Sequence, residues 1–244
     1  IASSLESLQK QVQTRTASRW RSAPAFSWRA DISGRFPRWF LKSKWGEAEL
    51  ALQGQRGAGN TNLALHVFEG LGFEPRSYLP QLITVWWPAR MQRIHLPNMA
   101  CPIFVSGDHN AQGVESLRQL LTSYRYKRLH LLVAVGIKKD LDSIMERFAG
   151  FPRVNLWLTT ASFQSRTEQE FGPWLERANG YFRRPMEALQ EIAMVAQEQD
   201  LCVITGSLYL AGDILRYLHE SAEKNMSQKA HEPTDAATIG HSAN

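Results

Sequence analysis

The sequence lacks the features that identify several common protein classes. Only 2 of its 244 residues are cysteine, and both lie in apolar runs, so we expect buried thiols and exclude a disulfide-rich scaffold. No stretch approaches the roughly 18 consecutive apolar residues of a membrane helix, and no signal-like segment opens the chain. We therefore expect a soluble protein that is not secreted and resides in the cytoplasm.

Several catalytic and metal-binding motifs are also absent. The phosphate loop G-x-x-x-x-G-K-[ST] does not occur, and the glycine-rich segment 54–59 has no lysine, so we interpret it as a connecting turn. No G-x-G-x-x-G follows a predicted strand, which argues against a dinucleotide oxidoreductase. No G-x-S-x-G elbow and no zinc-like Cys/His spacing is present. His66 lies among apolar residues of a predicted helix and is expected to be packed, so the sequence predicts no metal site.

The positive charge is concentrated in one segment. Residues 15–45 contain eight Lys or Arg and one Asp, a charge of +7, whereas the net charge of the chain is +5, which leaves −2 for the rest. Because Trp and Phe are interleaved with these basic residues, the segment could form a stacking groove for single-stranded nucleic acid. Apolar residues from Phe26 to Ile32, however, alternate with polar ones, which is typical of half-buried strands with a solvated face. We favour the second interpretation, which makes nucleic acid an unexpected partner.

Two parts of the chain have different hydrophobic patterns. In the first part we expect a short helix at 3–13, aromatic strands to about residue 52, and a helix from its N-cap Asn60 to about residue 70. From residue 100 onward, apolar runs alternate with helical stretches. The strands are expected at 103–105, 129–135, 154–158 and 201–204, and the helices at 111–124, 140–148, 168–178, 185–199 and 208–222.

This alternation predicts an α/β fold, with a doubly wound, mostly parallel sheet and helices on both faces, preceded by a partial α+β segment. We expect domain boundaries at 1–95 and 96–222, followed by a polar, disordered tail at 223–244. In such sheets ligands bind beyond the carboxyl ends of the strands.

Three expected turns lie at those strand ends, at 106–110, 136–140 and 205–209. Each turn could present backbone N–H groups at a helix start to an anion, with His109 or Lys139 adding charge. For Ser207 and Asp108 a helix-capping role is the alternative. From the residues alone, the sequence predicts an α/β ligand-binding domain with three candidate loops.

Four stretches over about residues 45–220 resemble, in order, the folylpolyglutamate synthase/dihydrofolate synthase family, relatives of the Mur ligases. Asn60-Thr-Asn-Leu-Ala-Leu is similar to the family's Asn-Ala-Ala-Leu-Ala-Leu, and Trp87-Pro-Ala-Arg to its Trp-Pro-Gly-Arg. Ser106-Gly-Asp-His-Asn is similar to Asp-Gly-Ala-His-Asn, and Gly206-Ser-Leu-Tyr-Leu to the closing Gly-Ser-Leu-Tyr-Leu. A weaker match aligns Lys139-Asp with Asp-Lys-Asp. The resemblance implies the end of the central domain followed by a Mur-ligase-like C-terminal domain.

The resemblance also implies a reaction. Such enzymes use ATP and Mg²⁺ to phosphorylate a carboxylate of folate or pteroate, and the amine of glutamate then attacks the acyl phosphate to form an amide. It implies roles for seven loop residues: nucleotide contacts by Arg90, His109, Asn110 and Ser207, catalysis by His109 and Lys139, and substrate contacts by Ser106 and Asp108.

Two positions depart from the family pattern. Ser106 stands where the family has an acidic residue, so a contact to ribose or to the substrate amine would depend on Asp108. Ala89 replaces the glycine between Pro88 and Arg90.

The family's N-terminal half, with its phosphate loop and most Mg²⁺ ligands, is also missing from the sequence. A fragment is the expected explanation, and a half supplied by a partner or a degenerate homologue are the alternatives. The competing functional interpretation is a non-catalytic nucleotide- or nucleic-acid-binding α/β module that uses the basic segment 15–45. The acceptor, whether pteroate, folate or a polyglutamate, is left open.

Overall fold

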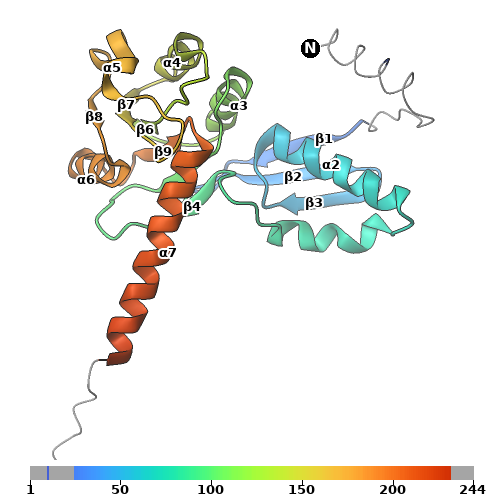
Figure 1. The fold of residues 1–244 in the computed structure, drawn as a ribbon. Helices are drawn as coiled ribbons and strands as arrows, with labels where there is room; N and C mark the ends of the chain where they lie inside the picture. Colours follow the sequence, from blue (N-terminus) through green and yellow to red (C-terminus); the bar gives the residue numbers. More distant parts are fainter. Residues whose placement is uncertain (1–9, 11–24, 232–244) are drawn as a thin grey trace, which may run out of the picture. The chain divides into compact units, whose positions relative to one another are not determined.

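The computed structural model describes residue 10 and residues 25–231, and the chain divides into two compact units (Figure 1). Unit 1 comprises Ile1–Trp87 with Leu120–Arg125, and unit 2 comprises Pro88–Gln119 with Tyr126–Asn244. The helix expected at 3–13 lies outside the described residues apart from residue 10. None of the helices in the described part combines the length and hydropathy that a membrane span requires.

Unit 1 contains an antiparallel sheet that packs against one α-helix. The strands β1 (Ser27–Asp31), β2 (Arg38–Ser43) and β3 (Gly46–Leu50) are neighbours in that order, and α2 (Gly54–Gly70) and the 3₁₀ helix η1 (Pro75–Thr84) follow. Side chains alternate along a strand, so Trp39 and Leu41 of β2 are buried, together with Leu65 of α2. The alternation predicted for β1 holds only in part, because Trp28 and Ile32 are 40% and 45% exposed.

Helix α2 differs from its predicted form. It begins at Gly54, with Gln53 as N-cap, so the glycine-rich segment is helical and Asn60 is an exposed residue inside the helix. Close packing explains the glycine: a Cβ on Gly57 would lie 2.4 Å from the carbonyl oxygen of Leu52. The packed role predicted for His66 is confirmed, since its ring lies 4.5 Å from that of Trp45 and burial lowers its pKa.

Unit 2 is built on a six-stranded sheet in the order β4-β5-β9-β6-β7-β8. Its strands are β4 (Gln92–Ile94), β5 (Ile103–Val105), β6 (Leu129–Val133), β7 (Val154–Thr159), β8 (Gly180–Phe182) and β9 (Leu201–Thr205). Only β4 runs antiparallel to its neighbour; the other pairs are parallel. Every residue of β5, β6 and β9 is buried, which explains their continuous apolar sequences. The predicted doubly wound, mostly parallel α/β fold is confirmed.

Helices cover both faces of this sheet (Figure 1). They are α3 (Ala111–Leu121), α4 (Leu141–Ala149), α5 (Glu168–Phe171), the 3₁₀ helix η2 (Gly172–Leu175), α6 (Pro185–Val195) and α7 (Leu208–His231). Helices α6 and α7 pack together on one face, where Leu189, Ile192 and Ile214 meet Ile103 and Ile204 of the strands. Right-handed crossovers place α3 and α4 on the other face.

Three helices end at other residues than predicted, and two strands were missed. The helix expected at 168–178 breaks after Phe171, because Gly172 adopts a φ of 53° and Pro173 follows. Helix α6 ends at Val195, and α7 continues to His231, beyond its expected end at residue 222. Strands β4 and β8 have three residues each, too few for a recognisable alternation.

Candidate active site

The candidate site lies at the carboxyl edge of the central strands of unit 2. Strand β9 lies between β5 and β6, and the three are parallel, so the loops that follow them emerge side by side. These loops contain residues 106–110, 206–207 and 134–140. The three loops predicted from the sequence therefore share one edge of the sheet, which is where ligands bind in doubly wound folds.

Backbone hydrogen bonds lock the first two loops together. The N–H of Ser106 donates to the carbonyl oxygen of Ile204 at 2.9 Å, and the N–H of Gly206 donates to that of Asp108 at 2.9 Å. The Thr205 hydroxyl donates to the same Asp108 carbonyl at 3.2 Å. Because these groups are buried, the loop after β5 is held in a fixed position against the end of β9.

The turn that contains Arg90 joins the same edge. The N–H of Gly107 donates to the carbonyl oxygen of Ala89 at 2.8 Å. Ala89 is buried, whereas the side chain of Arg90 is exposed and makes no hydrogen bond or ion pair with the described residues. The structure thus positions the Arg90 backbone beside the 106–110 loop and leaves its guanidinium available to a ligand.

Two predicted substrate residues, Ser106 and Asp108, contact each other. The Ser106 hydroxyl donates to a carboxylate oxygen of Asp108 at 2.7 Å, and the two residues are only 2% and 3% exposed. The Asp108 carboxylate is therefore an internal acceptor that stabilises the loop. The capping role considered for Asp108 belongs to Asn110, whose Oδ1 accepts from the N–H of Gly113 at 2.7 Å at the start of α3.

His109 is half-buried and has an oriented ring. Its Nδ1 lies 2.9 Å from the carbonyl oxygen of Gly107. A carbonyl can only accept, so Nδ1 carries a proton, and in the neutral ring Nε2 is the unprotonated nitrogen. Nε2 has no hydrogen-bond partner among the described residues, so it can accept from or coordinate with a bound substrate.

Ser207 has the capping role that the sequence offered as its alternative. Its Oγ accepts from the N–H groups of Tyr209 and Leu210, at 3.1 and 3.4 Å, at the start of α7. The hydroxyl hydrogen of Ser207 is not used by these bonds. Asn110 likewise keeps its amide nitrogen after Oδ1 has capped α3.

Lys139 lies in the third loop, after β6. Its side chain is exposed and makes no hydrogen bond or ion pair within the described residues. The loop itself is fixed by Arg166, whose guanidinium donates to the carbonyl oxygens of Lys139 and Ile137 at 2.8 and 3.3 Å. Sequence reasoning missed Arg166, because an arginine that binds backbone carbonyls has no motif; the nearby α4 cap Asp140 was the available signal.

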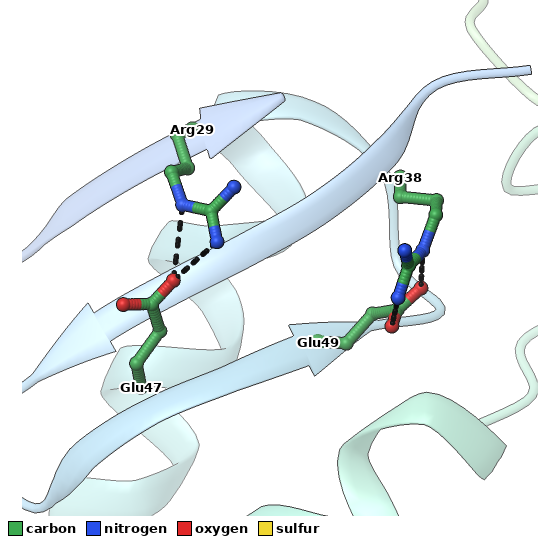
Figure 2. A network of polar contacts seen from close by, with 4 residues as sticks. All are labelled: Arg29, Arg38, Glu47 and Glu49. Carbon is green, nitrogen blue, oxygen red and sulfur yellow. Dashed lines mark hydrogen bonds and ion pairs between the residues drawn. The ribbon is translucent and has the colours of Figure 1, made fainter. Parts of the chain in front are cut away.

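The basic segment of unit 1 shows a different arrangement. Figure 2 shows Arg38 beside Glu49, with Nη2 2.5 Å from Oε2, and Arg29 reaching across β2 to Glu47 at 2.7 Å. The hydrogen bond from Arg38 lowers the pKa of the Glu49 carboxyl. Lys44 pairs with a carboxylate of α2 at 2.7 Å. The described basic side chains that make these pairs are therefore largely neutralised, in agreement with a solvated strand face; Arg15, Arg19 and Arg21 lie outside the described residues.

Comparisons with known proteins agree with this architecture. The chain is 26% identical to the dihydrofolate synthetase of Saccharomyces cerevisiae, over 75% of this chain and 49% of that protein. Its structure matches the Mycobacterium tuberculosis folylpolyglutamate synthase complexed with ADP, with a TM-score of 0.61, 22% identity, and coverage of 78% of this chain and 46% of that one. The resemblance to folylpolyglutamate and dihydrofolate synthases is confirmed.

A second solved structure extends this finding. Escherichia coli FolC in complex with DHPP and ADP matches with a TM-score of 0.60 and 16% identity, over 80% of this chain and 46% of that one. No model of a known protein family matches the chain. The chain thus shares the folylpolyglutamate synthase fold and spans about half the length of the relatives it matches.

Proposed function

We propose that this chain forms the carboxyl-terminal part of an ATP-dependent ligase that joins glutamate to folate or pteroate through an acyl phosphate. One observation carries the proposal: the Ala89, Asp108 and Gly206 backbones are hydrogen-bonded to one another's loops at the edge of the sheet. These are three of the segments on which the family resemblance rests. Relatives described as complexes with ADP and with DHPP support nucleotide and folate ligands.

The exposed cations suit the transfer of a phosphoryl group. Negative charge spreads over the oxygens of the transferring phosphoryl group, and preorganised cations stabilise it. Arg90 and Lys139 are proposed to supply this charge, because neither side chain is neutralised within the described residues. His109 is proposed to accept a proton or a hydrogen bond at Nε2, in keeping with its oriented ring.

Asn110 and Ser207 are proposed to contact nucleotide or glutamate as donors. Their oxygens already accept from helix N–H groups, so the amide hydrogens of Asn110 and the hydroxyl hydrogen of Ser207 are the groups left for a ligand. Ser106 and Asp108 are mutually hydrogen-bonded and buried, so we propose that they position the loop and that any substrate contact there is made through backbone groups.

The proposed Mg²⁺ ligands lie in the half that the relatives have in addition. Within the described residues no three His, Cys, Asp or Glu side chains gather in a way that could hold a metal ion. The same half would supply the phosphate loop, which this sequence lacks. A cytoplasmic location, where folate ligases meet ATP and glutamate, is part of the proposal.

Substitutions in the assembled ligase test the roles of Arg90 and His109. Arg90→Ala and His109→Ala should each lower kcat/KM for glutamate addition by about 10²-fold, because each removes a contact to charge that develops in the transition state. Arg183→Ala, beyond β8 at the far end of the sheet, and His95→Ala, beyond β4 at the opposite edge, are matched exposed controls. Wild-type turnover in a folded Arg90 or His109 variant would remove that residue from the site.

Lys139 has a matched control in its own loop. Lys139→Ala should reduce kcat with little change in the KM for folate, whereas the adjacent exposed Lys138→Ala should leave both constants near wild type. Equal losses in the two variants would indicate a general effect of loop charge and would contradict a specific role for Lys139.

A further inference from the structure

Helix α2 is apolar on the face that points away from its own sheet. Leu63, Val67 and Leu71 recur every four residues, and they are 52%, 53% and 68% exposed. The opposite side of the helix, with Ala58 and Leu65, is buried against the strands of unit 1. A helix that is apolar on both faces is typical of one covered on both sides.

Aromatic side chains extend this exposed surface at the end of the helix. The ring of Phe68 lies 5.3 Å from those of Phe73 and Tyr78, and the three residues are 38%, 51% and 40% exposed. We call the six side chains together the α2 apolar face: Leu63, Val67, Phe68, Leu71, Phe73 and Tyr78. Contiguous exposed apolar surface of this kind marks interaction sites in soluble proteins.

The other outer surface of unit 1 has the opposite character. On the face of the sheet turned away from α2, Arg29 and Arg38 form ion pairs with carboxylates, and the Arg29 guanidinium lies 3.9 Å from the centre of the Phe40 ring (Figure 2). Such a face is suited to water. Unit 1 therefore has one surface that needs no cover and one, the α2 apolar face, that lacks one within the described residues.

We propose that the α2 apolar face docks the polypeptide that corresponds to the half of the folate ligases that this chain does not span, whether that half is joined to the chain or separate. The relatives are about twice as long as the matched part, which covers 49% and 46% of them. Unit 1 is a single sheet with one covering helix, whereas domains are built from layers packed on both sides of their apolar elements. This inference rests on the proposed function.

The test measures the reactivity of an engineered thiol on this face. Native Cys101 and Cys202 are 4% and 0% exposed, and burial raises the pKa of Cys202, so both should react slowly with a maleimide. Val67→Cys places a thiol in the α2 apolar face, and Lys42→Cys places the control thiol on the exposed polar side of β2. Each variant is made in two proteins: residues 1–244 alone, and a chimera in which the unmatched part of the Mycobacterium tuberculosis folylpolyglutamate synthase is fused before residue 1.

In the chain alone, both thiols should react rapidly. In the chimera, labelling at position 67 should slow by about 30-fold, as expected for a site in the centre of an interface, while labelling at position 42 stays unchanged. Equal reactivity at position 67 in both proteins overturns the proposal. Slow labelling in the chain alone also overturns it: dependence on concentration would identify a second copy as the occupant, and independence would identify residues 1–24.

A second measurement needs no chimera. The double variant Val67→Lys, Leu71→Lys should melt at the same temperature as the free wild-type chain, because both side chains face solvent there. A large fall in melting temperature would mean that the chain covers the face itself and would overturn the proposal.

Ligase activity separates this proposal from the proposed function. If position 67 is protected in a chimera that adds no glutamate, the docking surface stands and the proposed function fails. If the chimera is active while position 67 labels freely, the docking surface fails and the proposed function stands.

Discussion

Gly206 is the backbone position on which the candidate site depends most. It has a φ of 90°, a conformation that residues with a Cβ rarely adopt, and its N–H donates to the Asp108 carbonyl. A Cβ at this position would lie 2.4 Å from the carbonyl oxygen of Ala134 and 2.8 Å from Cγ1 of Val133. Gly206→Ala therefore forces the end of β9 away from the end of β6.

Two costs add in this variant. A left-handed conformation with a Cβ costs about 1–2 kcal/mol. Moving a backbone carbonyl and a buried side chain costs about 1–3 kcal/mol, by analogy with overpacked cores. We therefore expect unit 2 to lose about 2–5 kcal/mol of unfolding free energy, and the Gly206–Asp108 hydrogen bond to lengthen.

Hydrogen exchange read by mass spectrometry follows the two units separately, so unit 2 can be assessed by the β9 amides under EX2 conditions. Gly212→Ala is the matched control, because Gly212 lies in α7 with no atom within 4 Å of an added Cβ. Alanine in an open helical position should stabilise by up to about 1 kcal/mol. If Gly206→Ala exchanges like the wild type, the close approach of the β9 and β6 ends is wrong and the geometry of the site must be rebuilt.

Three further predictions follow from other parts of the molecule. The free chain should bind single-stranded nucleic acid with a Kd of about 10⁻⁴ to 10⁻⁶ M at physiological salt, and submicromolar binding that is lost on replacing Trp28 and Trp39 would overturn the solvated-face interpretation. The free chain should bind ATP in the millimolar range or more weakly, by calorimetry, and should not hydrolyse it, since it lacks a phosphate loop; stoichiometric turnover by pure chain would contradict this. Burial lowers the pKa of His130 below 6.5, despite Asp200 Oδ2 lying 3.3 Å from its Nε2, so this group's contribution to the unfolding free energy is complete above pH 6.5 and is lost as the pH falls through the lowered pKa. Urea unfolding of His130→Phe should show a flatter pH profile in that range, and an unchanged profile would exclude this histidine as the cause.

The sequence predicts the central strands of unit 2 well because they are buried on both faces. Their apolar runs are continuous, and each is followed by small or polar residues at a fixed point, so β5, β6 and β9 are located within two residues. The edge strands β4 and β8 are too short to give a periodic signal. Glycine misled the prediction of α2, because the same residue type that usually ends a helix is needed at Gly57 for close contact with Leu52.

The candidate loops were located from the sequence, but the role of each side chain was not. Ser207 and Asn110 are typical of both caps and ligand contacts, and only hydrogen-bond geometry shows that their oxygens cap α7 and α3. The Ser106–Asp108 pair could not be anticipated, because a contact between residues two apart depends on how the loop turns. Arg166 acts on backbone carbonyls contributed by a different loop, which is tertiary information.

The turn around Arg90 bears on whether the chain has kept its function. Ala89 and Met91, on either side of Arg90, have φ values of 53° and 52°, and neither is glycine. Each left-handed residue costs about 1–2 kcal/mol, a considerable fraction of a typical domain stability of about 5–15 kcal/mol. The turn is held nonetheless, because the Ala89 N–H donates to Gln92 Oε1 at 3.1 Å and its carbonyl accepts from Gly107. The alanine that replaces the family glycine therefore keeps the bend that presents Arg90, and strain maintained at such a cost is typical of residues that bind a ligand.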